Sequence, residues 1–92
     1  MERTVEVVPS GSGFKVSVSY GEHTFPLGTV SGKELSDVLW KLCIEAETKN
    51  IPTNVFAYYF GDIKIQVLYF KLMEELDVLN KNNFHFEWQW GW

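Results

Sequence analysis

Three side chains in this sequence are of the types that attack substrates or move protons near neutral pH: Cys43, His23 and His85. A nucleophilic cysteine needs a partner base or a positive environment that stabilises its thiolate. Cys43 instead belongs to the apolar stripe of a predicted helix, where a buried and unreactive thiol is expected. His23 follows a predicted turn and His85 lies on the polar side of a predicted strand, so both are expected at the surface. The sequence therefore predicts no catalytic residue and no enzyme; a histidine acting with a nearby carboxylate is the less favoured hypothesis.

Metal and cofactor sites are not indicated by the spacing of these residues. One cysteine and two distant histidines match no known spacing of zinc ligands. The only glycine-dense loop, Gly11-Ser12-Gly13, precedes a strand rather than a helix and has no partner lysine in a phosphate-binding arrangement. We expect no metal, no cofactor and a plain hairpin loop at this position.

The charge distribution argues against nucleic acid and membrane partners. The chain has 8 Lys and Arg residues, none adjacent to another, and a formal net charge of −4. A groove that follows phosphates needs clustered basic residues, and so does an anionic membrane surface. No apolar stretch reaches membrane-spanning length, and Met1–Thr4 lacks the pattern of a signal peptide. A single cysteine allows no intrachain disulfide, so we expect a cytoplasmic protein.

The end of the chain carries the strongest pattern in the sequence. From residue 84 to 92 aromatic and non-aromatic residues alternate, which on a strand forms one aromatic wall. Its members are Phe84, Phe86, Trp88, Trp90 and Trp92. The wall fits a core layer under helices, a stacking surface for bases, or a platform for sugars or a protein. Bases are disfavoured because no basic groove accompanies the wall. We favour the core for residues 84–90 and expect Trp92 to be exposed, leaving open whether Trp88, Trp90 and Trp92 are core or surface.

The N-terminal third reads as an antiparallel meander. Strands are predicted at Thr4–Val8, Phe14–Tyr20 and His23–Leu27, separated by a loop at 9–13 and a tight turn at 21–22. Pro26 cannot donate to a neighbouring strand, which predicts an edge position for the third strand.

A helix is predicted from about Gly32 to Thr48. Ser31 and Glu34 have the spacing of a capping box, in which each side chain bonds the other residue's backbone N–H. The apolar residues that follow have helical spacing. They are Leu35, Val38, Leu39, Leu42, Cys43 and Ala46.

The second half contains one ambiguous segment. Val55–Phe60 is uniformly apolar, which predicts a central strand buried on both faces. Residues 63–70 alternate as a return strand would, yet 65–79 also carries a helical stripe. Because no turn residue interrupts 63–79, we prefer one helix from Asp62, as its N-cap, to about Leu79. The aromatic strand would then return parallel to Val55–Phe60 through a right-handed crossover.

These elements predict a single globular domain spanning residues 1–92. The order is β-β-β-α-β-α-β, and the fold class is α+β. We expect a mixed, mostly antiparallel sheet with two helices packed on one face.

Two groups of apolar residues lie on the helix faces that should be exposed to solvent. Trp40 and Ile44 are one turn apart on the face opposite the first apolar stripe, and Ile63, Val67 and Phe70 repeat this on the second helix. Such patches indicate association surfaces when nothing within the chain covers them. Cover by a loop or helix contact, a homodimer and a different partner protein are the alternatives.

Acidic residues accompany these apolar residues. Asp37 lies near Trp40, and Glu74, Glu75 and Asp77 occupy the last turn of the second helix. The group is either a solvated face or an acidic patch that steers a basic partner.

Together these features predict a small acidic, non-catalytic, aromatic-rich domain that binds another protein. It would occlude its partner as an inhibitor, in the style of phage inhibitors of host proteins or of toxin immunity proteins. The expected partner-binding residues are Trp40, Ile44, Asp37, Glu74, Glu75, Asp77 and Trp92. The alternative is a small-ligand or carbohydrate binder that uses the C-terminal aromatic strand.

Overall fold

The computed structural model of the chain describes residues 2–61, 63–78 and 80–90. All seven predicted elements are present in the predicted order. They are β1 (Arg3–Ser10), β2 (Gly13–Tyr20), β3 (His23–Val30), α1 (Gly32–Thr48), β4 (Thr53–Tyr59), α2 (Ile63–Asp77) and β5 (Phe84–Trp90). No helix within these residues is long and apolar enough to cross a membrane.

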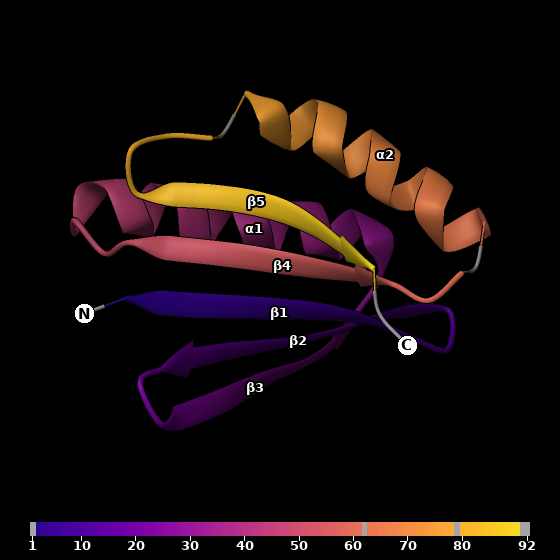
Figure 1. Cartoon of the computed structure of the whole chain (residues 1–92), viewed down its shortest axis with the longest axis horizontal. Helices are drawn as coiled ribbons and strands as arrows, with labels where there is room; N and C mark the ends of the chain where they lie inside the picture. Colours follow the sequence, from indigo (N-terminus) through magenta and orange to yellow (C-terminus); the bar gives the residue numbers. More distant parts are fainter. Residues whose placement is uncertain (1, 62, 79, 91–92) are drawn as a thin grey trace.

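The strands form one mixed sheet with the order β3-β2-β1-β4-β5. The first three strands pair antiparallel as a meander, whereas β4 pairs parallel with both β1 and β5. Figure 1 shows the strands stacked in this order, with α1 behind the sheet and α2 beyond it at the β5 side. The α+β class, the mostly antiparallel sheet, the two helices on one face and the parallel return of β5 are confirmed.

The core lies between the sheet and the helices. Alternating residues of each strand face the helices, and those of β1, β2 and β4 are almost fully buried. Tyr69 and Leu72 of α2 close the core from above, together with the inner face of α1. The apolar core residues are Val5, Val7, Phe14, Val16, Val18, Leu35, Leu39, Cys43, Ala46, Val55, Ala57, Tyr69, Leu72 and Phe84.

Helix α1 begins and ends as its sequence predicts. The Glu34 amide donates to Ser31 Oγ at 3.1 Å, and the Ser31 amide donates to Glu34 Oε1 at 3.2 Å. These bonds to Ser31 lower the pKa of the Glu34 carboxyl. At the other end Asn50 takes a positive φ of 55°, a conformation that asparagine tolerates and that ends the helix before Pro52.

Three predicted details are wrong. Pro9 and Ser10 pair within β1, so the first loop is only Gly11-Ser12, and β3 continues past Leu27 to Val30. Strand β4 is internal but not buried on both faces, because none of the described elements covers the side of the sheet away from the helices. Phe56 and Tyr58 lie on that open side and are half-buried by neighbouring strands. Partial burial, and then the charge of Glu6, raise the pKa of Tyr58.

The ambiguous segment is a helix. The helical alternative is favoured because Tyr69 and Leu72 of its apolar stripe insert into the core. Ile65 of the same stripe is half-buried and packs against the core. The predicted cap Asp62 and end Leu79 lie outside the described residues. Of the aromatic wall, Phe84 is fully buried and Phe86 and Trp88 are half-buried against the core.

Candidate functional site

The residues with potential for acid–base or nucleophilic chemistry lie far apart. His23 begins β3 and His85 lies in β5, so the two exposed histidines occupy opposite edges of the sheet. Cys43 is buried in α1, and burial, then the charge of Glu47, raise the pKa of its thiol. Within the described ranges no three of the His, Cys, Asp and Glu side chains are grouped as metal ligands would be.

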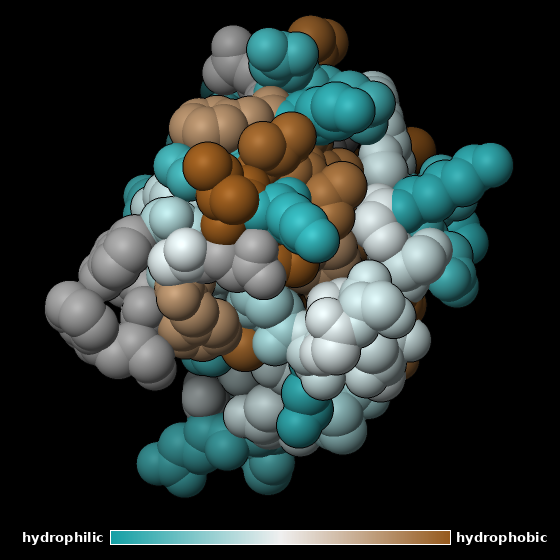
Figure 2. All heavy atoms as spheres, turned by 90° about the vertical axis from the view of Figure 1, so that its right-hand side faces the viewer, coloured by the Kyte–Doolittle hydropathy of each residue, from teal (hydrophilic) through white to brown (hydrophobic). Residues whose placement is uncertain are grey.

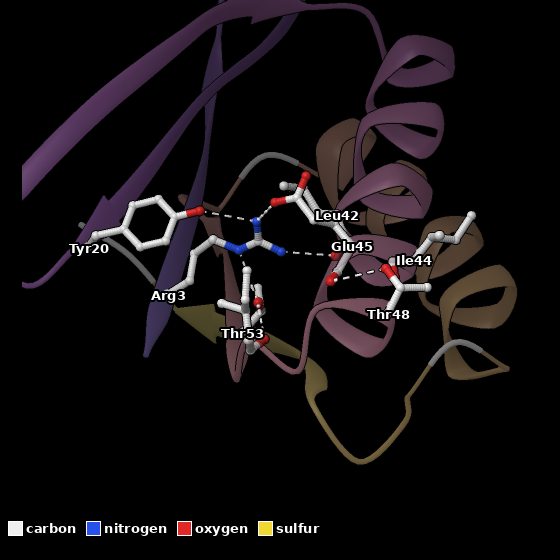
Figure 3. A network of polar contacts seen from close by, with 8 residues as sticks. Arg3, Tyr20, Leu42, Ile44, Glu45, Thr48 and Thr53 are labelled. Atoms are coloured by element: carbon white, nitrogen blue, oxygen red, sulfur yellow. Dashed lines mark hydrogen bonds and ion pairs between the residues drawn. The ribbon is translucent and has the colours of Figure 1, made fainter. Parts of the chain in front are cut away.

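One polar cluster was not anticipated from the sequence. Arg3 is only 1% exposed, and its guanidinium lies between the sheet and α1 (Figure 3). Its Nε donates to Thr53 Oγ1 at 3.0 Å, Nη1 to Tyr20 Oη at 3.2 Å, and Nη2 to the Leu42 carbonyl at 3.0 Å. Nη1 also forms an ion pair with the Glu45 carboxylate.

This cluster holds the fold together and offers no site for a substrate. All three guanidinium nitrogens are already bonded, and a buried arginine is tolerated only when it is paired in this way. A sequence signal was available, because Arg3 shares its strand parity with Val5 and Val7 and must therefore face the core.

Among the described residues, α2 exposes more large apolar side chains than any other element. Ile63 is 71% exposed, Val67 49% and Phe70 51%. These three residues, which we call the α2 ridge, follow one another at helical spacing on the side of α2 away from α1. Phe60, just before the helix, is also exposed. Viewed from the end where α2 begins, apolar side chains gather on this part of the surface (Figure 2).

The α2 ridge continues into the core through an aromatic stack. The ring of Phe70 lies parallel to that of Trp88, with centroids 5.5 Å apart and an interplanar angle of 9°. Trp88 in turn meets Tyr69 edge to face, with centroids 4.7 Å apart. Phe70 thus has one face against the core and the rest in solvent, which fixes its orientation at the surface.

The predicted apolar pair on α1 is exposed, so it is not covered by a loop or a helix contact among the described residues. Trp40 is 40% exposed and Ile44 is 57% exposed. Trp40 follows Ser36 by one helical turn, so this pair extends the side of α1 that borders α2.

A groove of about 440 Å³ separates the first turns of α1 from the middle of α2. It brings together two predicted acidic residues, Asp37 and Glu75, from different helices. Ser36 Oγ donates to Glu75 Oε2 across the groove at 3.1 Å. The lining residues are Gly32, Lys33, Ser36, Asp37, Leu68, Lys71, Leu72 and Glu75.

The charges of this groove are balanced, since two lysines line it beside the two carboxylates. Glu74, at the position before Glu75, is exposed and does not line the groove. An isolated acidic patch is therefore not what the described residues form. The side chain of Asp77 and the whole of Trp92 lie outside the described part of the chain, so the expectations for them stay predictions.

The sequence matches no protein-family model, and no curated protein is significantly similar to it.

Proposed function

We propose that this chain is a small acidic, non-catalytic domain that binds another protein through the outer face of its helices. The observation that carries the proposal is the exposure of the α2 ridge. A surface helix normally presents an apolar stripe to the core and polar residues to water. α2 instead also exposes Ile63, Val67, Leu68 and Phe70 among its described residues.

The ridge has the character of an interface centre. Large apolar side chains supply most binding energy when a partner desolvates them, with aromatic residues prominent among them. Phe70 is held in place by Trp88, so binding would cost little side-chain entropy. Trp40 and Ile44 on α1 provide a second apolar contact beside the groove.

The acidic residues have a smaller role in this proposal than the sequence suggests. Asp37 and Glu75 share their groove with Lys33 and Lys71. Such mixed charge favours orientation and specificity over long-range attraction of a basic partner. Occlusion of a partner's own functional surface, as an inhibitor would do, needs no further chemistry from this chain.

The carbohydrate alternative has less support from the described residues. Phe84, Phe86 and Trp88 face the core, so this part of the aromatic wall contributes to folding. A sugar platform would have to use the end of the strand.

The test is affinity capture from the native cell with three forms of the chain. Val67→Glu places a charge in the α2 ridge, and Leu27→Glu makes a comparable change on β3, where the side chain is also 49% exposed. We expect a specific partner protein to be retained by the wild type and by Leu27→Glu, and to be lost with Val67→Glu. Equal retention by both variants, with both folded by circular dichroism, would contradict the proposal.

A further inference from the structure

The two edges of the sheet differ in how they are protected from further pairing. Edge strands expose unpaired N–H and C=O groups, and proteins usually block them with proline or with irregular backbone. β3 is blocked in this way: Pro26 lacks an N–H, the pairing shifts between Val16 and Ser17, and Gly28 has a φ of 95°. β5 pairs with β4 at all seven positions without any irregularity.

Half of the β5 edge is closed by the preceding loop. The Lys81 amide donates to the Phe84 carbonyl at 3.1 Å, and the Phe86 amide donates to Asn80 Oδ1 at 3.0 Å. Since backbone groups of a strand alternate in direction, the Phe86 carbonyl and both backbone groups of Trp88 point the same way. Within residues 2–61, 63–78 and 80–90, no hydrogen bond reaches these three groups.

The open half of the edge adjoins the α2 ridge. Phe70 stacks on Trp88, so the α2 ridge is in direct apolar contact with a residue of the strand edge. Backbone groups that need partners and apolar side chains that need cover therefore occupy one side of the molecule.

We propose that this side binds a second copy of the chain, with β5 of each copy pairing antiparallel about a two-fold axis at Trp88. The inference rests on the proposed function and names the partner of the α2 ridge. The Trp88 amide would donate to the carbonyl of Trp88 of the partner subunit, and the amide of Trp88 of the partner subunit would donate to the Trp88 carbonyl. The Trp90 amide would donate to the carbonyl of Phe86 of the partner subunit. Ten strands would then form one continuous sheet, with the two α2 ridges meeting on its helical face.

The hydrogen bond from Phe86 to Asn80 favours this register. An axis at Phe86 or at Glu87 would place the Phe86 amide, which Asn80 already occupies, in the pair at the axis or next to it. An axis at Trp88 leaves the central pair free and would involve that amide only in the outer pair, where the carbonyl of Trp90 of the partner subunit would stay without its bond. An axis at Glu87 would also oppose two carboxylates on the open face, which destabilises a strand pair. The axis at Trp88 instead sets Glu87 opposite Gln89 of the partner subunit, a carboxylate facing an amide. Gln89 Nε2 already donates to Glu87 Oε2 within one chain, at 3.1 Å.

The experiment is sedimentation equilibrium of the full chain from low to high micromolar concentration, with charge variants at the proposed contact. Gln89→Lys would face Glu87 of the partner subunit twice in the dimer and should tighten the dimer about two- to thirty-fold. Gln89→Glu should weaken it by a similar factor. Thr29→Lys and Thr29→Glu, on the open face of β3, are the matched controls and should leave the dissociation constant unchanged.

Amide hydrogen exchange gives the second readout. We expect the Trp88 amide to exchange more slowly as dimer forms, while the Phe86 amide, bonded to Asn80, changes little. A chain that is monomeric at every concentration overturns the inference. So does a dimer whose dissociation constant is unchanged by the Gln89 variants and whose formation does not slow exchange of the Trp88 amide. A monomeric wild type leaves the proposed function standing, because capture with Val67→Glu tests the α2 ridge independently of self-association.

Discussion

α1 and α2 lie on the same face of one sheet, yet they relate to it differently. α1 buries Leu35, Leu39, Cys43 and Ala46 on one stripe. It is also tied to the strands by polar bonds from Arg3 to its backbone and to Glu45. Among its described side chains, α2 buries Tyr69 and Leu72 and exposes four large apolar residues.

The difference separates what folding requires from what folding leaves over. Most apolar residues of α1 belong to the core or pack against it, whereas Trp40 and Ile44 are exposed. The apolar residues of the α2 ridge contribute little to the core, yet exposing them carries a risk of aggregation. A surface of this kind is best explained by a partner, so α1 serves folding and the outer side of α2 serves binding.

The largest effect is expected at the point where α2 does reach the core. Tyr69→Ala should lower the free energy of unfolding by about 3–5 kcal/mol, because a fully buried ring is lost from between Phe14 and Trp88. Phe70→Ala, at the next position, removes a half-exposed ring and should cost clearly less. Urea denaturation followed by circular dichroism measures both. A cost for Phe70→Ala equal to that for Tyr69→Ala would show that the α2 ridge belongs to the core.

The second prediction compares the polar contacts that hold α1 with those that hold α2, through the loss of unfolding free energy when one carboxylate is removed from each. Glu45→Ala leaves the guanidinium of Arg3 buried without its counter-ion and should cost about 1–3 kcal/mol; Glu45 is partly exposed, so water reduces the loss. Glu75→Ala removes a carboxylate of α2 that accepts a hydrogen bond from Ser36 of α1. It should change the free energy of unfolding by less than about 0.5 kcal/mol. Equal costs in chemical denaturation would mean that α2 is held by polar contacts as firmly as α1.

The start of α1 gives a smaller effect with a defined pH dependence. Ser31→Ala should lower the free energy of unfolding by about 1 kcal/mol through loss of the cap. The pKa of Glu34 is lowered in the folded state, so its contribution is present above the ordinary carboxyl pKa and is lost as the pH falls through the folded value. The gap between wild type and Ser31→Ala should therefore narrow in acid. A gap in urea midpoints that widens below pH 4 would contradict this assignment of the cap.

The sequence predicts most of the fold because its signals are local. The capping box fixes the start of α1, and Gly21 and Pro26 mark the turn and the edge of the meander. Where two periodicities compete, as in residues 63–70, the helical stripe decides because it continues through Tyr69 and Leu72. Periodicity also places Trp40, Ile44 and the α2 ridge off the core-facing stripes, but their exposure is known only from the structure, because a loop or a helix contact could have covered them.

What the sequence does not predict depends on contacts between distant segments. The ion pair between Arg3 and Glu45 joins residues 42 positions apart in the sequence, and no local pattern predicts which partner Arg3 has. The apolar run of β4 predicts that Phe56 is buried, because nothing in it reveals that the described helices cover only one face of the sheet. The balanced groove is likewise a product of helix packing, since Asp37 meets Lys71 only in three dimensions.

The smallest expected effect on stability is the most informative one about the two helices. Ile63→Ser removes a side chain that is 71% exposed, so the free energy of unfolding should change by less than about 0.5 kcal/mol. Ile65→Ser makes the same chemical change two residues later, where the side chain is half-buried against the core, and should cost about 1–3 kcal/mol. Because both variants make the same change of residue, the difference between their denaturation midpoints reports only the effect of position on α2. If both variants lose stability equally, the ridge is part of the core and needs no partner; if only Ile65→Ser does, the apolar surface at Ile63 has no role in folding and binding is what explains it.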